Sequence, residues 1–151
     1  MLVAVDTNVF AYAEGGDDVR KARIAIRWLL GMDGKIVMPT QVAGELYNVL
    51  TRKFGRSRAV AVDRVNRNAT LFLPPSASDL DDALALAAKH ELQIWDALIL
   101  VIAATAECRV LLSEDMHEGF VYRGVTIANP FAERLHPLLA SLLDASPGPN
   151  K

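Results

Sequence analysis

Short, wholly apolar segments of strand length alternate along this chain with longer segments of helical pattern, and this alternation strongly constrains the fold. Leu2–Val5 and Val110–Leu112 contain no polar residue, as expected for central strands of a parallel sheet that helices cover on both faces. Ala97–Ala106 is almost as apolar and is long enough to form a buried helix. The pattern therefore predicts an α/β domain with a mainly parallel sheet.

The predicted elements cover nearly the whole chain, with a capping box at Ser78 and Asp81 as one start signal and Gly31 as one stop signal. The predicted strands are Leu2–Val5, Lys35–Met38, Leu71–Leu73, Val110–Leu112 and Val125–Ala128. The predicted helices run from Asp17 or Asp18 to Gly31, Thr40 to about Lys53, Ser57 to about Asn68, Ser78 through Ala87, Trp95 to Glu107, and Leu135 to Leu143. We expect one domain over residues 1–145 and a flexible tail at 146–151.

The bulk properties indicate a globular protein of the cytoplasm. With 151 residues, 52% of them hydrophobic, the chain can bury a sizeable core and does not have a disordered composition. A single cysteine, Cys108, excludes an internal disulfide and is expected to fill the core. No secretory signal is expected, and the longest apolar stretch falls short of the ~20 residues that a membrane span needs.

Four carboxylates, those of Asp6, Glu45, Asp96 and Asp115, lie beside apolar segments where an unpaired charge would be costly. Asp6 and Asp115 follow predicted strands, and open parallel sheets bind ligands beyond the carboxyl ends of their strands. A cleft at that edge could collect all four acids, which would repel one another unless a cation neutralised them. The chain is therefore predicted to be a divalent-metal enzyme that cuts phosphodiester bonds.

Each acid also has a structural interpretation that the sequence leaves open. Asp6 and Asp96 could cap helices, and Asp115 could be a solvated loop residue. Glu45 falls on the apolar helical face that contains Val42 and Leu46, which predicts a core-facing position. Its alternatives are a pairing with a buried arginine or a place at the edge of that face.

Other catalytic classes lack their residues. His90, His117 and His136 are too far apart for the helical spacing of a zinc enzyme. Gly15-Gly16 lacks the Lys and Ser/Thr of a phosphate-binding loop, and no Gly-x-Ser-x-Gly elbow is present. An aspartyl-phosphate phosphatase generally has an acid two residues after its nucleophile, where this chain has Asn8.

Basic residues are concentrated in one segment, Thr51–Arg67. It has six basic residues and one acid, a local charge of +5, whereas the rest of the chain has 10 basic and 17 acidic residues, a charge of −7. This polarity predicts contacts with an RNA backbone, and an ordinary solvated helix is the alternative. The residues predicted to bind RNA are Arg52, Lys53, Arg56 and Arg58.

Four motifs, in this order, resemble those of PIN-domain ribonucleases, and specifically of VapC-type toxins from bacterial toxin–antitoxin pairs. Each motif alone is weak, but their order and spacing are fairly specific, and the similarity spans about Met1 to Phe131. The motifs are Val5-Asp6-Thr7-Asn8-Val9, Pro39-Thr40-Gln41-Val42 with Glu45-Leu46, Trp95-Asp96-Ala97-Leu98-Ile99, and Leu111-Leu112-Ser113-Glu114-Asp115, and the closing Gly124–Phe131 is similar to the ending of one subset.

The resemblance implies that the four acids bind Mg²⁺ or Mn²⁺, which would activate a water for attack on phosphorus. Asp115 is preferred to Glu114 as the fourth acid because the Ser-x-Asp spacing matches. The implied metal ligands are Asp6, Glu45, Asp96 and Asp115, with Thr7, Asn8 and Ser113 as supporting polar groups.

The resemblance also implies a three-layer fold with strand order 3-2-1-4-5, a homodimer, an RNA substrate and inhibition by a small VapB-like antitoxin. Two alternatives remain within the fold. One is a housekeeping RNA-processing nuclease, and the other is a non-catalytic PIN-like binding module, whose mark would be a missing acid. None of the four acids is missing.

Overall fold

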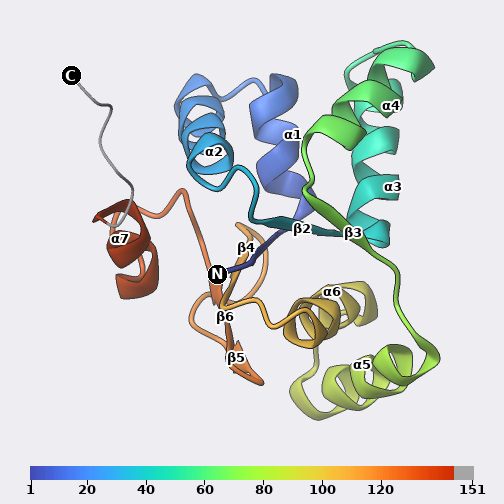
Figure 1. Ribbon diagram of the computed structural model, residues 1–151, viewed down its shortest axis with the longest axis vertical. Helices are drawn as coiled ribbons and strands as arrows, with labels where there is room; N and C mark the ends of the chain where they lie inside the picture. Colours follow the sequence, from blue (N-terminus) through green and yellow to red (C-terminus); the bar gives the residue numbers. More distant parts are fainter. Residues whose placement is uncertain (145–151) are drawn as a thin grey trace.

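The structure is a computed structural model that describes residues 1–144, and it has helices on both faces of a central sheet (Figure 1). The strands are β1 (Val3–Val5), β2 (Ile36–Pro39), β3 (Leu71–Leu73), β4 (Val110–Leu112), β5 (Val121–Tyr122) and β6 (Val125–Ala128). The helices are α1 (Thr7–Gly15), α2 (Val19–Gly31), α3 (Thr40–Asn48), α4 (Arg58–Arg67), α5 (Ala77–His90), α6 (Ile94–Thr105) and α7 (Pro137–Asp144), and a π-helical turn, η1 (Val49–Lys53), continues α3.

The sheet has the order β3-β2-β1-β4-β6-β5, and every neighbouring pair is parallel except the antiparallel pair of β5 and β6. The prediction of a three-layer α/β domain with a mainly parallel sheet is confirmed. The predicted order is also close to the observed one, since β6 is the predicted fifth strand. The additional strand, β5, is only two residues long, too short for a recognisable sequence pattern.

The centre of the sheet determines where polar side chains can gather. β1 pairs with β2 on one side and with β4 on the other, so the connections leave β1 in opposite directions at this point. Ligands of open α/β sheets bind at such a switch point, beyond the carboxyl ends of the strands. Because Val5 is level with Leu112 in the register, the residues that follow them, Asp6 and Ser113, emerge side by side.

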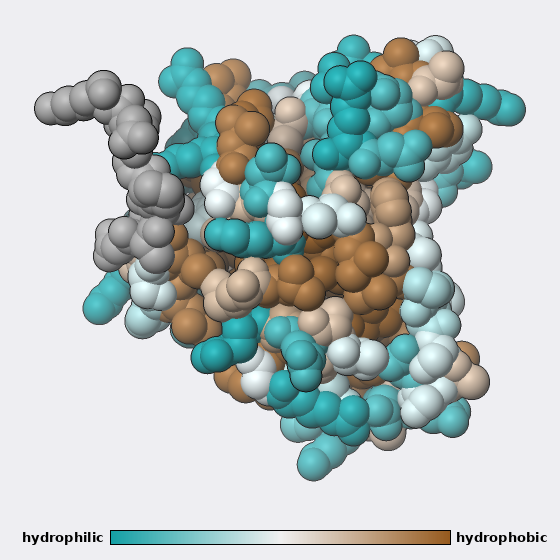
Figure 2. Space-filling model, viewed as in Figure 1, coloured by the Kyte–Doolittle hydropathy of each residue, from teal (hydrophilic) through white to brown (hydrophobic). Residues whose placement is uncertain are grey.

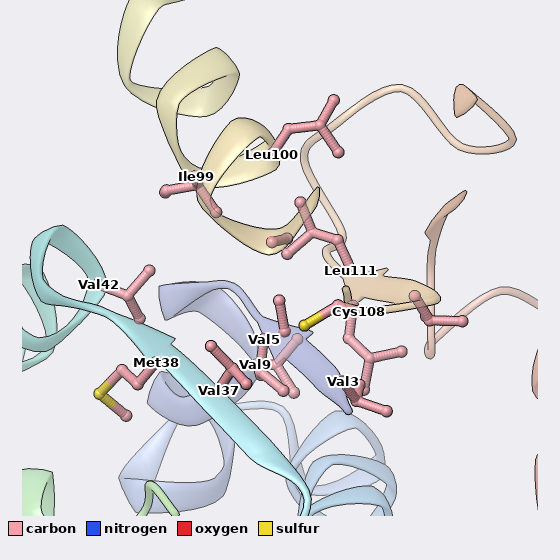
Figure 3. Close-up of a cluster of buried hydrophobic side chains, with 14 of the residues drawn as sticks. Val3, Val5, Val9, Val37, Met38, Val42, Ile99, Leu100, Cys108 and Leu111 are labelled. Atoms are coloured by element: carbon pink, nitrogen blue, oxygen red, sulfur yellow. The ribbon is translucent and has the colours of Figure 1, made fainter. Parts of the chain in front are cut away.

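The core lies on both faces of the sheet and includes side chains from β1, β2, β4 and α6 (Figure 3). α6 packs on β2, β4 and β6, while α5 packs on the outer side of α6. Cys108 is 2% exposed, which confirms its predicted role in the core. Trp28 of α2 and Leu50 of η1 are also buried in this core.

Two sequence predictions about helices differ from the structure in detail. The predicted helices did not include α1, although capping of a helix was left open for Asp6; α1 begins directly after this residue, and the Asp6 carboxylate accepts a hydrogen bond from the Thr7 amide at 2.8 Å. The capping box of α5 is Ser76 with Asp79, not Ser78 with Asp81. Asp79 also accepts a hydrogen bond from Thr105 of α6, a tertiary contact that a local pattern does not show.

The remaining boundaries agree within two or three residues, apart from the ending of the Thr40 helix, whose last part is the π-helical turn η1. Hydrophobic surface gathers near the middle of the face shown in Figure 2, where Figure 1 places the edge strand β3. Within residues 1–144, no helix combines the length and apolar character that crossing a bilayer requires. The predicted flexible tail, 146–151, lies outside the described residues.

Candidate active site

A pocket of about 520 Å³ opens at the carboxyl ends of β1 and β4 and brings together acids from four distant parts of the chain. All four predicted metal ligands line it, together with two of the three predicted supporting residues. The lining residues that carry polar or aromatic side chains are Asp6, Thr7, Asn8, Tyr12, Glu45, Lys53, Phe54, Gln93, Trp95, Asp96, Glu114 and Asp115. The third supporting residue, Ser113, is fully buried and contacts Asp6 from below the pocket surface.

Asp6 is the buried acid of the pocket, with 7% of its surface exposed. One carboxylate oxygen accepts from the Thr7 amide, and the other accepts from the Ser113 hydroxyl at 2.8 Å. Burial raises the pKa of Asp6 to about 6 despite these donors, and the nearby Asp96 and Glu45 add to the rise. A cation bound in the pocket would offset both the cost of burying the ionised Asp6 carboxylate and its repulsion from Asp96 and Glu45.

Asn8 links the ends of β1 and β4. Its side-chain nitrogen donates to Oδ2 of Asp6 at 3.1 Å and to Oδ2 of Asp115 at 3.2 Å. Its side-chain oxygen accepts from the backbone amide of Glu114 at 3.3 Å. A single amide therefore contacts two of the four acids, one at the end of β1 and one beyond the end of β4.

Glu45 corrects one sequence prediction, since its side chain is exposed rather than core-facing. Val42 and Leu46 of the same helix are fully buried, so Glu45 lies at the edge of the apolar face, the alternative that the sequence left open. From that edge its Oε2 accepts a hydrogen bond from Oγ1 of Thr7 at 2.7 Å. α1 and α3 are thus joined at the pocket by a polar contact.

Asp96 lies in the first turn of α6 and is half-buried. The N-cap position belongs to Gln93, so Asp96 is not the cap of this helix. Burial raises the pKa of Asp96, and repulsion from Glu45 and then Asp115 raises it further. Within residues 1–144, no donor forms a hydrogen bond to this carboxylate, which leaves both of its oxygens available to a ligand.

Glu114 and Asp115 are adjacent in sequence but have different surroundings. The Glu114 carboxylate forms an ion pair with Lys21, whose ammonium also donates to the Tyr12 hydroxyl at 3.2 Å. Asp115 is exposed, and within the part of the chain that the structure describes its carboxylate accepts a hydrogen bond only from the Asn8 amide. Glu114 is therefore already neutralised by a cation of the protein, and this supports Asp115 as the fourth acid of the site.

The donor set fits a hard divalent cation. Carboxylate oxygens are the ligands that Mg²⁺ and Mn²⁺ prefer, and Mg²⁺ keeps several of its waters when it binds to proteins. Among residues 1–144, no three acidic, histidine or cysteine side chains are close enough to enclose a metal ion by themselves.

The basic residues divide between two pockets. Lys53, the last residue of η1, lines the acidic pocket, whereas Arg52 beside it lines a second pocket of about 590 Å³. Arg56 and Arg58 also line the second pocket, next to Ser57, the N-cap of α4. All four predicted RNA-binding side chains are exposed. π-helical turns are frequent at functional sites, and here the turn places consecutive basic residues on different pockets.

Sequence reasoning missed several residues of the acidic pocket. Nothing in the sequence indicates that Gln93, Phe54 and Tyr12 line the pocket, because their positions depend on how α1, η1 and α6 pack around the sheet. Trp95 had a usable signal, since this aromatic residue stands beside Asp96 in the first turn of a helix whose residues Ala97–Ala103 are apolar and buried. Lys21 became relevant only through its tertiary contact with Glu114.

Comparison with known families now adds to this geometry. The family model for the PIN domain matches residues 3–117, and the chain therefore belongs to the PIN domain family. The matched region contains all four acids of the pocket. No protein of curated function matches the chain in sequence.

The solved structures that the chain is similar to share its fold at low sequence identity. VapC20 from Mycobacterium tuberculosis, a toxin that cleaves the sarcin-ricin loop, is 19% identical with a TM-score of 0.61, over 72% of this chain and 86% of that chain. A toxin–antitoxin complex from Klebsiella pneumoniae is 19% identical with a TM-score of 0.64, over 85% and 97%. VapBC2 from Rickettsia felis, bound to a DNA fragment from its promoter, is 17% identical with a TM-score of 0.55, over 76% and 89%.

Proposed function

We propose that this chain is a divalent-metal-dependent endoribonuclease and the toxin of a toxin–antitoxin pair. The observation that carries the proposal is the collection of Asp6, Glu45, Asp96 and Asp115 in one pocket of a PIN-domain chain. The similarity of its fold to a VapC toxin and to a toxin–antitoxin complex supports the toxin assignment.

Each polar residue has a task in this proposal. Asp6, Glu45, Asp96 and Asp115 hold Mg²⁺ or Mn²⁺, which supplies a more acidic water and offsets charge on the phosphate. Ser113 and Asn8 fix the rotamer of Asp6, and Thr7 fixes that of Glu45, so that carboxylate oxygens stay directed into the pocket. The ligands themselves would thus be oriented by hydrogen bonds from neighbouring residues, as is usual at metal sites.

RNA binding would use the basic residues at the end of α3 and the start of α4. Lys53 borders the acidic pocket and can bind the phosphate nearest the cut, whereas Arg52, Arg56 and Arg58 bind phosphates farther along the strand. Arginine and lysine side chains that contact phosphates release counterions, so the affinity depends on salt concentration.

Replacing Arg52, Arg56 and Arg58 together by Ala should weaken RNA binding and reduce its salt dependence. Each lost phosphate contact is expected to lower the slope of log affinity against log salt by about 0.7 for single strands. Fluorescence anisotropy with a labelled RNA at several salt concentrations measures both effects. The matched control replaces the exposed Arg23, Arg27 and Lys89, which changes the net charge equally. If both triple variants give the wild-type slope, the second pocket does not bind RNA.

The proposed activity is tested with purified protein and single-stranded RNA in Mg²⁺, in Mn²⁺ and in excess EDTA. Cleavage that requires the metal, together with growth arrest when the chain is expressed alone, supports a toxin ribonuclease. Metal-dependent cleavage without growth arrest would instead indicate a housekeeping RNA-processing nuclease. RNA binding without any cleavage would indicate a non-catalytic module, and the metal-dependent function would then be wrong.

We further propose that the chain acts in the cytoplasm as a homodimer and is silenced by a small VapB-like antitoxin. A cluster of acids that includes two carboxyls with raised pKa is stabilised by any well-placed cation. Arginine suits this site, because its planar guanidinium can bind two carboxylate oxygens at once. The antitoxin is therefore expected to insert an Arg or Lys, or a segment carrying one, into the acidic pocket.

Co-expression with the product of the neighbouring reading frame should yield a stable complex that no longer cleaves RNA. Substituting the partner's basic residues one at a time by Ala should restore cleavage at one or two positions, with the complex still formed. Co-purification and cleavage assays measure the two properties separately. Full inhibition that survives the loss of every basic residue near the pocket, or the absence of any complex, would contradict this mechanism.

A further inference from the structure

Trp95 is unusually exposed for its size and lies at the acidic pocket. Its side chain is 51% exposed, whereas the other tryptophan of the chain, Trp28, is 3% exposed. The seven residues from Ala97 to Ala103 that follow in the same helix are buried. An indole has a large apolar surface, which remains in contact with water only where packing does not demand its burial.

Several neighbours of Trp95 around the pocket match the parts of a nucleotide. Lys53 is a basic residue suited to a phosphate, and Gln93 is an exposed amide suited to the edge of a base. Trp95 provides a flat aromatic face, and Asp96, one residue further, belongs to the proposed metal site. Trp95 and Asp96 are consecutive in the first turn of α6, so the same helix carries the indole and one acid of the proposed metal site.

We propose that Trp95 is the stacking platform for one unpaired base of the RNA, next to the bond that is cut. This inference rests on the proposed ribonuclease function and adds the residue that holds one unpaired base beside the cut. In a duplex both faces of each base are covered by neighbouring bases, so a base must leave the stack before an aromatic side chain can contact it. Gln93 would then contact the edge of the stacked base.

Intrinsic fluorescence tests the contact directly, because Trp28 is buried and an RNA-dependent change therefore reports on Trp95. The variant Asp6→Asn, which is expected to be inactive because it lacks one of the proposed metal ligands, is titrated with 12-nucleotide oligomers of uridylate, adenylate and cytidylate, and with a 12-base-pair RNA duplex. Quenching by the single strands and a much weaker effect of the duplex are expected. Equal quenching by the duplex, or no quenching by any single strand, would overturn the proposal.

Substitution of Trp95 tests how much the contact contributes. Base stacking on an aromatic side chain has an energy that corresponds to roughly 5- to 150-fold in affinity. Trp95→Ala is expected to weaken single-strand binding within that range, and Trp95→Phe should retain most of the affinity. Leu30→Ala, which removes an apolar side chain that is 73% exposed on α2, is the matched control and should bind like the wild type.

The position of the base is found with an oligomer that the wild type cuts at one bond, in which each base in turn is replaced by an abasic ribose. One abasic site beside the cut should lower kcat/KM in the wild type and cause no further loss in Trp95→Ala.

If Trp95→Ala binds and cuts single strands like the wild type, the platform does not exist, although the ribonuclease function still stands. If the substitution Trp95→Ala prevents only the binding of a protein partner, the exposed indole is a protein contact and the proposal is wrong. Should the wild type cut no RNA, the ribonuclease function fails, and the quenching titration still decides the role of Trp95.

Discussion

Asp96→Asn is expected to lower RNA cleavage by at least about 10²-fold, the loss typical of removing one electrostatic group from a catalytic site. The same substitution should raise the thermal midpoint of the metal-free protein. Asp96 accepts no hydrogen bond from residues 1–144, and its charge is opposed by burial and by Glu45 and Asp115. A neutral amide of the same shape removes this repulsion. The opposite signs of the two effects distinguish a functional acid from a structural one.

The measurements for Asp96→Asn are cleavage rates in Mn²⁺ and thermal unfolding in EDTA. A gain of about 1 kcal/mol would shift the midpoint by about 2–4 °C in a domain of this size. Asp33→Asn, at an exposed acid outside the pocket, is the control and should change neither property. Wild-type cleavage by Asp96→Asn would refute the site assignment, and a lower midpoint in EDTA would show that Asp96 stabilises the fold.

Lowering the pH from 7 to 5 should weaken the binding of Mn²⁺ by about tenfold, because a proton competes for the Asp6 carboxylate. The pKa of Asp6 is raised to about 6 from an ordinary value of 3.8, mainly by burial. At pH 7 the carboxylate is mostly ionised and ready to bind the ion, and at pH 5 it is mostly protonated. Calorimetric titration with Mn²⁺ at several pH values measures this dependence.

Linkage also predicts the stability of the metal-free protein. Between pH 4 and 6 the folded protein binds more protons at Asp6 than the unfolded chain does, because the folded pKa is the higher one. Asp6 therefore contributes a decrease in stability as the pH rises through this window. Saturating Mn²⁺ should reverse that trend, since the ion binds the ionised carboxylate. Asp6→Asn should lose this contribution, and a Mn²⁺ affinity that is flat from pH 5 to 7 would contradict the role of Asp6.

The sequence and the structure agree where patterns extend over many residues. The buried strands Val3–Val5 and Val110–Leu112 were predicted, as Leu2–Val5 and Val110–Leu112, because burial on both faces leaves no polar residue. The helix α6 was predicted as Trp95 to Glu107 because its run from Ala97 to Ala104 is wholly apolar. The strand order agreed through the family resemblance, apart from the short β5. By contrast, the Ser76 and Asp79 capping box was misplaced by two residues, since two Ser-x-x-Asp patterns overlap and both satisfy the local rule.

For the site, residue types alone indicated which acids to examine but not how they are held. Glu45 was expected in the core because helical periodicity gives its angular position only roughly. Its exposure and its hydrogen bond with Thr7 depend on how α1 packs against α3. The pairing of Lys21 with Glu114 is equally non-local, and it leaves Asp115 as the freer of the two adjacent acids.

The sequence by itself determined the α/β class, the central strands and the four acids, because burial and the chemistry of carboxylates act on each segment separately. Only the tertiary structure decided that these acids share one pocket, that Asn8 bridges two of them, and that Trp95 stands exposed beside them. The physical reason is the parallel register, which aligns Val5 with Leu112 and so brings residues more than 100 positions apart into hydrogen-bond contact. Such pairings arise from the packing of whole elements and leave no mark in the local sequence.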